Sequence, residues 1–227
     1  MAIIAVLAVL QLSGLDTLQV RTISFPPGRE EIPDSVRYGL PHIRLSTRQG
    51  TANIWLLRSA DTFFVAVALP DSTHYWGDEF VLSIDTRGDG GTSPQHDDFQ
   101  WYIRRTLDSS VVFRGRSGRW EPPKGDPDWR LGTERSGGGW EVSRRDSPAG
   151  WALVMRLDPV WLLGADGRLP RLAVRIFDND PQGWFAWPLP PGTAQPSSVE
   201  KTPDLWAAFT PGPSHPKTAK HESTKNY

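Results

Sequence analysis

Three tryptophans stand in turn-like segments rather than in apolar runs, where an indole ring is placed to bind a ligand. Trp76 lies in HYWGD, between His74 and Asp78, and Trp184 and Trp187 lie in GWFAWP. A large aromatic face left in water is costly unless something flat packs on it. A pyranose ring, whose C–H bonds line one side, is a natural partner. These segments therefore indicate a stacking platform for a sugar, with a half-buried loop anchor as the alternative for Trp76.

The other tryptophans have a simpler explanation. The chain has 11 tryptophans among 227 residues, and several occupy strand-like contexts in which burial is the usual outcome. Trp120 and Trp129 fall in an irregular segment, where they line a groove or pin a loop. If GWFAWP is a strand, Phe185 and Trp187 share one face and Trp184 takes the other, so one tryptophan of that pair belongs to the core. The tryptophans predicted as core residues are Trp55, Trp101, Trp140, Trp151 and Trp206.

Aspartates in and after a strand end have the chemistry of a cation site. Asp85, Asp89 and Asp97 offer hard carboxylate oxygens of the kind that calcium binds, and Asp178 and Asp180 form a second acidic pair. The spacing lacks the terminal glutamate of an EF-hand loop. Aspartates that cap solvated turns are the alternative interpretation. We therefore expect either a structural calcium site or a set of turn caps here, and no other cofactor.

Composition and missing motifs exclude several classes of function. The net charge is −1, which gives no reason to expect nucleic acid or an anionic membrane surface as a partner. The chain has no cysteine, so it has no disulfide and no thiolate metal site. It lacks a Gly-x-Ser-x-Gly motif, a His-x-x-x-His motif and a phosphate loop, and nothing marks a catalytic carboxylate pair. We expect a protein that is not an enzyme.

The residues between these motifs predict a body made of short strands. Glycine and proline, 21 of each, supply frequent turns, and no amphipathic helix of useful length is present. Pro159–Leu163 allows one helical turn, and 117–138 is an irregular connection or a binding loop. An all-β fold, an antiparallel β-sandwich of jelly-roll or immunoglobulin size with little helix, is therefore predicted for residues 20–210. Strands are predicted over 53–58, 62–69, 79–84, 99–106, 111–114, 140–145, 151–157 and 171–177.

Both ends of the chain differ from this body. Residues 2–12 (AIIAVLAVLQL) are apolar but too few to span a bilayer. They fit the apolar part of a signal peptide over residues 1–14, although the positively charged start is missing, and an apolar N-terminal strand is the alternative. A signal peptide predicts an exported protein, periplasmic or extracellular. Residues 211–227 are polar, proline-bearing and without apolar period, which predicts a disordered tail.

The order of the motifs along the chain carries more information than any one of them. In sequence they are DTFFVAV from Asp61, WGDEFVLSID from Trp76, DDFQ from Asp97, GWALVMRL from Gly150, LAVRIFD from Leu172 and the tryptophan segment 184–187. In this order the chain resembles the family 9 carbohydrate-binding modules and their DOMON-like relatives, over roughly Thr51 to Phe209. Those proteins are β-sandwiches, so the resemblance implies the same fold class.

The resemblance implies a site in which a sugar lies between two tryptophans. One stands on the loop before the strand at 79–84, and the other stands on a late loop. By motif, Trp76 matches the first, and Trp187 matches the second with Trp184 close behind. Related modules also bind structural calcium, which keeps a cation at the acidic loop under consideration. The resemblance therefore implies non-catalytic binding of an oligo- or polysaccharide.

The polar residues that complete the family's site match less well. Its glutamate falls on Val81, and its arginine falls on Tyr102. Charged groups aim a sugar by directed hydrogen bonds, so their loss leaves stacking without orientation. Gln100 and Tyr102 are kept as ligand-binding candidates. Substitutes for the missing charges are sought among Glu79, Arg104 and Arg105, with Gln100.

Two other functions stay open. An exported interaction or envelope protein would keep the fold without the sugar site, as the lost charges allow. Some DOMON-type sandwiches hold haem b between a methionine and a histidine. Met155 is the only internal methionine, with His42, His74 and His96 as candidate partners, although core packing is the simpler account of a mid-strand methionine.

Overall fold

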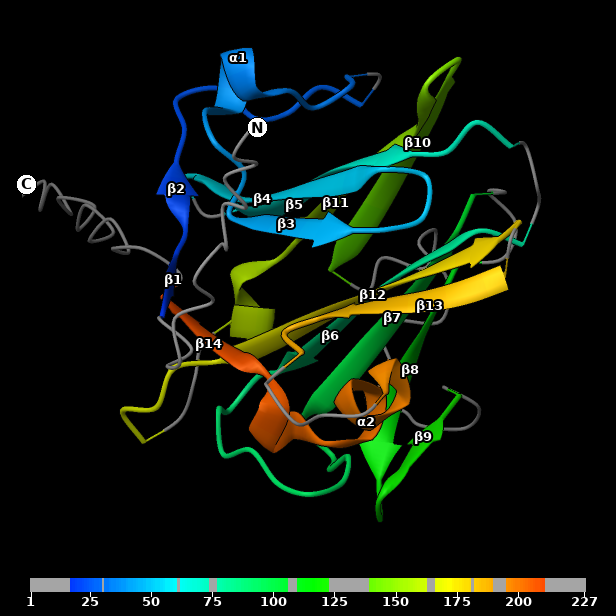
Figure 1. Ribbon diagram of the computed structural model, residues 1–227. Helices are drawn as coiled ribbons and strands as arrows, with labels where there is room; N and C mark the ends of the chain where they lie inside the picture. Colours follow the sequence, from blue (N-terminus) through cyan, green and yellow to red (C-terminus); the bar gives the residue numbers. More distant parts are fainter. Residues whose placement is uncertain are drawn as a thin grey trace, which may run out of the picture.

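The computed structural model describes residues 17–29, 31–60, 62–73, 77–105, 110–122, 139–162, 166–180, 182–189 and 195–210. Within them the chain forms two β-sheets that lie face to face (Figure 1). The predicted all-β sandwich is confirmed. The segments predicted as a signal peptide (1–14) and as a disordered tail (211–227) lie outside the described residues. No helix in these ranges is long and apolar enough to cross a membrane.

The smaller sheet takes its central strands from the most apolar part of the sequence. Its strand order is β10 (Trp140–Ser147), β11 (Gly150–Leu157), β5 (Thr62–Pro70), β4 (Thr51–Ser59) and β2 (Arg21–Thr22), with β3 (Ile43–Ser46) also paired to β4. β10 and β11 form the predicted hairpin. Gly150 follows its turn with a φ of +145°, and an added Cβ would lie 2.0 Å from the carbonyl oxygen of Leu69. The hairpin therefore needs glycine at this position.

The larger sheet carries the candidate site. Its strand order is β1 (Leu18–Gln19), β14 (Ala207–Thr210), β12 (Arg171–Asn179), β6 (Glu79–Asp85), β7 (Asp98–Arg104), β8 (Val111–Arg116) and β9 (Arg119–Glu121), with β13 (Gln182–Trp187) also paired to β12. The helical elements are short: α1 (Ser35–Tyr38), α2 (Pro196–Lys201) and 3₁₀ turns at Pro159–Leu162 and Pro203–Leu205. The helical turn predicted from Pro159 is therefore present.

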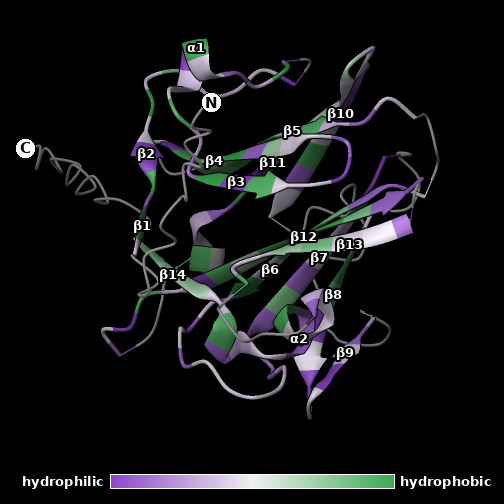
Figure 2. Cartoon of the chain, in the orientation of Figure 1, coloured by the Kyte–Doolittle hydropathy of each residue, from purple (hydrophilic) through white to green (hydrophobic). Residues whose placement is uncertain are grey.

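Apolar side chains from both sheets fill the space between them. Figure 2 shows hydrophobic residues along the strands of both layers. On β12, Leu172, Val174 and Ile176 point into this core, as the alternation in RLAVRIF predicts, and Arg175 and Phe177 take the outer face. Burial of one such aliphatic side chain is worth roughly 1.5–3 kcal/mol, so this layer holds the sandwich together. The tryptophans predicted as core residues are all buried: Trp55, Trp101, Trp140, Trp151 and Trp206.

The outer face of each sheet is partly covered by segments without a clear apolar period. On the smaller sheet, the N-terminal segment packs Tyr38 against Trp55. On the larger sheet, Val199 of α2 packs with Trp206 and with Ala173 of β12. The helix α2 lies against the outer side of this layer (Figure 1). On the outer face of the larger sheet, β6 is buried along its length, whereas the side chains of Trp184 and Arg104 stay partly exposed.

All the predicted strands are present, and their observed ends differ from the predicted ends by no more than two residues. The sequence does not predict β1, β2, β3, β9, β14 or α2. These elements have two to six residues each, which is too short to show a hydrophobic period.

Candidate functional site

The outer face of the larger sheet brings residues of three neighbouring strands into two rows. In the first row, Arg175 of β12, Val81 of β6 and Tyr102 of β7 are paired in register. Because side chains two apart on a strand share a face, the residues two positions away form a parallel row on the same surface. The second row is Phe177, Glu79 and Arg104.

Arg175 is the central side chain of this surface. Its guanidinium reaches past Val81 and donates to Glu200 of α2 at 2.9 Å and to the hydroxyl of Tyr102 at 3.0 Å. The side chain is 4% exposed, and its Nε has no hydrogen-bond partner among the described residues. Arginine presents its donors in a planar fork, so two such partners fix its orientation. The sheet therefore holds a rigid donor at this point.

Tyr102 belongs to the same network. Burial raises the pKa of its hydroxyl, and the Arg175 guanidinium acts in the opposite direction. The hydroxyl lies 3.4 Å from Oε1 of Glu200, and the ring packs edge-on against Phe113 with centroids 5.3 Å apart. Tyr102, at the position where the resemblance implies an arginine, is thus held in place and protonated.

Trp184 supplies an exposed aromatic surface next to this guanidinium. β13 pairs with β12 so that Trp184 lies opposite Phe177, with ring centroids 4.9 Å apart. The guanidinium carbon of Arg175 lies 4.5 Å from the indole centroid, which is a cation–π contact. Trp184 nevertheless stays 36% exposed. The ring is therefore held by the sheet while part of its surface is open to a ligand.

Trp187 lies on the other side of β13. It pairs with Val174 and, with Phe185, packs half-buried against the main core. The prediction that one tryptophan of this pair belongs to the core is confirmed, and that tryptophan is Trp187. The motif match favoured Trp187 as the platform, whereas the more exposed indole of the pair is Trp184.

Two other predicted ligand residues have different outcomes. Trp76 lies outside the described residues, which stop at Thr73 and resume at Gly77. Gln100 is fully buried and donates to the hydroxyl of Ser83 at 3.1 Å. Gln100 is therefore not open to a ligand, although it lies on the same face as Tyr102.

Two tryptophans hold α2 in position. Trp206 donates from Nε1 to the carbonyl of Val199 at 2.6 Å, and Trp120 donates to the carbonyl of Glu200 at 3.1 Å. Their rings are parallel, with centroids 6.3 Å apart. Trp120 thus pins its segment, as one of its two interpretations expected, and it also fixes the helix that carries Glu200. Trp129 lies outside the described residues.

Two consecutive arginines at the end of β7, Arg104 and Arg105, have different partners. Arg104 points to the outer face and pairs with Glu79 at 2.7 Å. Arg105 points the other way and is buried. Its guanidinium donates to Asp71 at 2.9 Å and contacts Asp78 at 3.3 Å, and its backbone amide donates to the carbonyl of Asp78 at 3.1 Å. Arg105 therefore fixes the residue next to Glu79 and so the start of β6.

Arg105 also pairs with Asp146 at 2.7 Å. The other two carboxyl groups beside it, those of Asp71 and Asp78, titrate differently. Burial raises the pKa of Asp78 to about 7, and a hydrogen bond with Asp71 acts in the same direction. Burial also acts to raise the pKa of Asp71, but hydrogen bonds from Asp78 and Thr73 outweigh it and the pKa is lowered. Below neutral pH, Asp78 therefore holds the proton of the pair and Asp71 holds the charge.

The acidic loop after β6 brings its three predicted ligands together. One carboxylate oxygen each from Asp85, Asp89 and Asp97 lies within 4.8 Å of the others. Asp85 is fixed by backbone amides: Oδ1 accepts from Gly88 at 2.6 Å and Oδ2 accepts from Gly90 at 2.9 Å. The loop thus brings together aspartates that lie up to twelve residues apart in the sequence.

The surroundings of the Asp97 carboxylate indicate whether a cation fits between these aspartates. Both of its side-chain oxygens are buried without a hydrogen-bond partner among the described residues, and the exposed His96 ring lies 3.5 Å from Oδ1. Burial raises the pKa of Asp85 and of Asp97, and it raises the pKa of Asp98 to about 8. Buried carboxylates without partners are costly unless a cation neutralises them. The residues present therefore fit a hard divalent cation.

Met155 has the surroundings of a packing residue. It is fully buried within the main core, as the simpler account of this methionine expects. Of its candidate partners, His42 accepts from the amide of Leu56 at 3.1 Å, and burial lowers its pKa to about 4. His96 is exposed, and His74 lies outside the described residues.

A solved structure shares this fold. The chain is similar to a carbohydrate binding module family 9 (CBM9) from Caldicellulosiruptor kristjanssonii in complex with cellotriose, with a TM-score of 0.51 and 14% sequence identity. The match covers 85% of this chain and 92% of that chain. The chain has the fold of family 9 carbohydrate-binding modules. The resemblance inferred from the order of motifs is confirmed at this level.

A CBM9 from the same organism in complex with glucose gives a TM-score of 0.49 and 12% identity, over 88% of this chain and 99% of that chain. No family model and no curated protein matches the sequence.

Proposed function

We propose that this chain is a non-catalytic carbohydrate-binding domain that takes a saccharide on the outer face of the larger sheet. The observation that carries the proposal is the exposed indole of Trp184 beside the fixed guanidinium of Arg175. A flat aromatic surface supplies stacking for a sugar ring, and oriented charged groups choose which hydroxyls it presents. Both kinds of group meet here on a rigid sheet.

Arg175 and Glu200 supply charges that the motif comparison did not find. The resemblance implies a glutamate and an arginine at the positions of Val81 and Tyr102. Here the guanidinium comes from the neighbouring strand, and the carboxylate comes from α2. Hydrogen bonds to charged groups contribute about 1.5–3 kcal/mol each, enough to select among sugars. The outer ion pair of Glu79 and Arg104 adds a second set of polar groups at the rim.

Trp76 is retained as a proposed second platform. It precedes Glu79 by three residues in the sequence, and Asp78 between them is anchored by Arg105. The proposal for Trp184 does not depend on Trp76.

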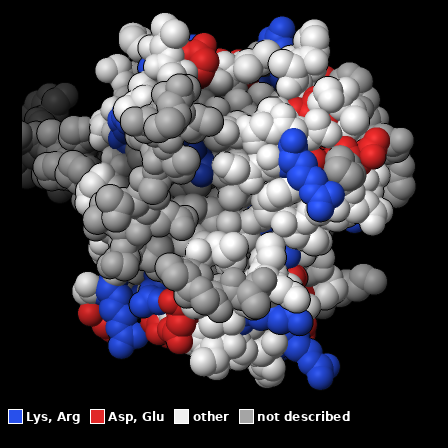
Figure 3. All heavy atoms as spheres, viewed as in Figure 1, with Lys and Arg blue, Asp and Glu red and all other residues white. Residues whose placement is uncertain are grey.

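Binding without catalysis is favoured by the state of the carboxylates on this surface. Glu79 and Glu200 are each held by an arginine, an arrangement that suits an acceptor of sugar hydroxyls. Figure 3 shows basic and acidic side chains side by side on one face rather than a continuous basic area. On the described part of that face, the mixture lacks the continuous basic patch that nucleic-acid binding uses. Export of the chain, inferred from residues 1–14, is part of the same proposal.

We further propose that Asp85, Asp89 and Asp97 hold a calcium ion. Calcium binds six to eight oxygen ligands, and these carboxylates with nearby loop oxygens offer that chemistry. The register places Asp85 opposite Asp98 at one end of the β6–β7 pair and Glu79 opposite Arg104 at the other. The ion would therefore neutralise the loop and stabilise the sheet, away from the sugar surface.

A panel of oligosaccharides titrated into the purified chain tests the sugar proposal. Cello-oligosaccharides come first because the similar module was solved with cellotriose, and xylo-oligosaccharides and other neutral glycans follow. We expect at least one to change the tryptophan fluorescence and to give a saturable heat of binding. A flat response across the panel would contradict sugar binding and favour an exported interaction protein that keeps the fold. A Soret band in the same preparation would instead establish the haem alternative.

A further inference from the structure

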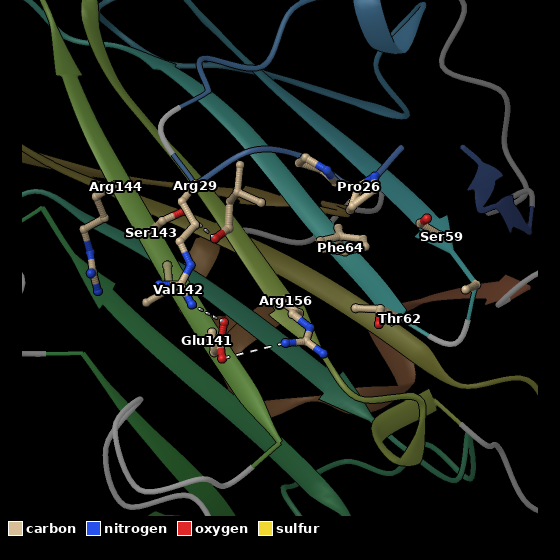
Figure 4. A pocket seen from close by; sticks show the side chains of 13 residues that line it. Pro26, Arg29, Ser59, Thr62, Phe64, Glu141, Val142, Ser143, Arg144 and Arg156 are labelled. Atoms are coloured by element: carbon tan, nitrogen blue, oxygen red, sulfur yellow. Dashed lines mark hydrogen bonds and ion pairs between the residues drawn. The ribbon is translucent and has the colours of Figure 1, made fainter. Parts of the chain in front are cut away.

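A hollow of about 850 Å³ lies on the outer face of the smaller sheet, on the other side of the sandwich from Trp184. It is lined by the N-terminal residues Pro26, Pro27 and Arg29 and by strands β10, β11, β5 and β4 (Figure 4). Its volume falls in the range of small-molecule sites, roughly 300–1,000 Å³. We propose that this hollow is a second ligand site, and that it binds a saccharide that carries a carboxylate.

The hollow has a fixed apolar floor. Phe64 of β5 and Val154 of β11 line it, and both are buried in the cluster that packs this face of the sheet. Pro26 and Pro27 form part of its rim, and their rings restrict the backbone. The shape is therefore set by the sheet and the prolines rather than by a ligand.

Two arginines meet one carboxylate on the wall of the hollow. The nearest nitrogens of Arg29 and Arg156 lie 3.3 Å and 3.7 Å from the oxygens of Glu141, and Figure 4 shows both side chains converging on it. All three side chains are at least about half exposed. Exposed ion pairs contribute little to stability, so these partners can exchange. Two guanidiniums and one carboxylate leave a formal positive charge that a carboxylate on a ligand would neutralise.

The backbone around the hollow argues for a sugar and against a peptide. β11 is paired with β10 and β5, and β5 is paired with β11 and β4, so the floor strands have no free edge, and the unpaired edge of the end strand β10 faces away from them. An extended peptide could not add to them through main-chain hydrogen bonds. Recognition falls to side chains, and Ser59, Thr62 and Ser143 supply hydroxyls beside the charged groups. Hydroxyls and guanidiniums over an apolar floor suit a sugar acid.

Isothermal titration calorimetry of the full chain with trigalacturonic acid tests the proposal, with its neutral methyl ester as the matched ligand. We expect the acid to bind at least tenfold more tightly than the ester. Arg156→Gln should weaken binding of the acid about tenfold, which is about 1.4 kcal/mol. Glu141→Gln should strengthen it, because the internal competitor loses its charge. Arg168→Gln, an exposed arginine outside the hollow, should leave it unchanged.

Several results would overturn the proposal. No heat of binding with the acid would overturn it, and so would equal binding of the ester. Loss of binding in Trp184→Ala instead of Arg156→Gln would move the ligand to the larger sheet. Equal binding of a triglutamate peptide would show a response to charge alone and would remove the assignment to a saccharide. If Arg156→Gln does not fold by circular dichroism, the acid–ester comparison and Glu141→Gln decide the question.

Discussion

Arg175 donates to the hydroxyl of Tyr102 at 3.0 Å across the strand that carries Val81. The contact joins β12 to β7 and passes over β6 at Val81. Val81 is the position at which the resemblance implies a glutamate. It shows how a chain with valine and tyrosine at these positions keeps a charged group on the same face. The guanidinium comes from β12, and its carboxylate partner comes from α2.

Replacing Arg175 by lysine should separate charge from geometry. Lysine keeps the positive charge but cannot present a planar fork to Glu200 and Tyr102 together. We expect sugar affinity to fall roughly tenfold or more, about 1.4 kcal/mol per factor of ten, and the melting temperature to decrease. The control is Arg168→Lys, an exposed arginine with no part in this network. Unchanged affinity in Arg175→Lys would show that the guanidinium does not orient the ligand.

Asp78 should make stability depend on pH. Its pKa is about 7 in the folded chain and near 3.9 in an unfolded one. The folded state therefore binds more protons between these values, so the contribution of Asp78 is complete at the acid end and is lost as the pH rises towards about 7. We expect Asp78→Asn, which mimics the protonated form, to lose less stability than the wild type when the pH is raised from about 5 to about 8.

Urea unfolding at both pH values measures this difference. Other buried aspartates with raised pKa values, Asp85 and Asp98 among them, also respond to pH. Only the difference between variant and wild type therefore isolates Asp78. Asp180→Asn, at an exposed position, serves as the control. Parallel pH curves for wild type and Asp78→Asn would contradict the account.

Calcium should stabilise the folded chain. A ligand that binds the folded state alone raises its stability by 1.4 kcal/mol for each tenfold excess over its dissociation constant. We expect the melting temperature to rise by several degrees on adding calcium and to fall on chelation. Asp97→Asn should abolish the response, because it removes the charge of a buried carboxylate that has no hydrogen-bond partner among the described residues. The control is Asp34→Asn at the N-cap of α1. It removes the same charge as Asp97→Asn but keeps the side-chain oxygen that caps the helix.

Local alternation was enough to predict most of the sandwich. RLAVRIF places Arg175 and Phe177 on the face opposite Leu172, and the structure confirms this. The same rule predicts that Trp184 and Trp187 separate, because a strand gives successive side chains to opposite faces. It does not say which of them faces the core, since that depends on the register of β13 against β12.

The rest of the site depends on contacts between residues far apart in sequence. Glu200 lies on a six-residue helix with no apolar period, and it reaches Arg175 only because Trp120 and Trp206 hold that helix against the sheet. The burial of Gln100 has the same origin, since its exposure depends on what covers the outer face. Motif spacing along one strand carries no information about such partners.

The most direct test of the sugar surface is the affinity of Trp184→Ala. Calorimetric titration with the best ligand of the panel should show a dissociation constant raised at least tenfold, or about 1.4 kcal/mol, with a melting temperature close to that of the wild type. Phe25→Ala, which removes an aromatic ring that is 77% exposed on the N-terminal segment, should bind as the wild type does. A Trp184→Ala variant that is folded and keeps the wild-type dissociation constant would contradict the central claim.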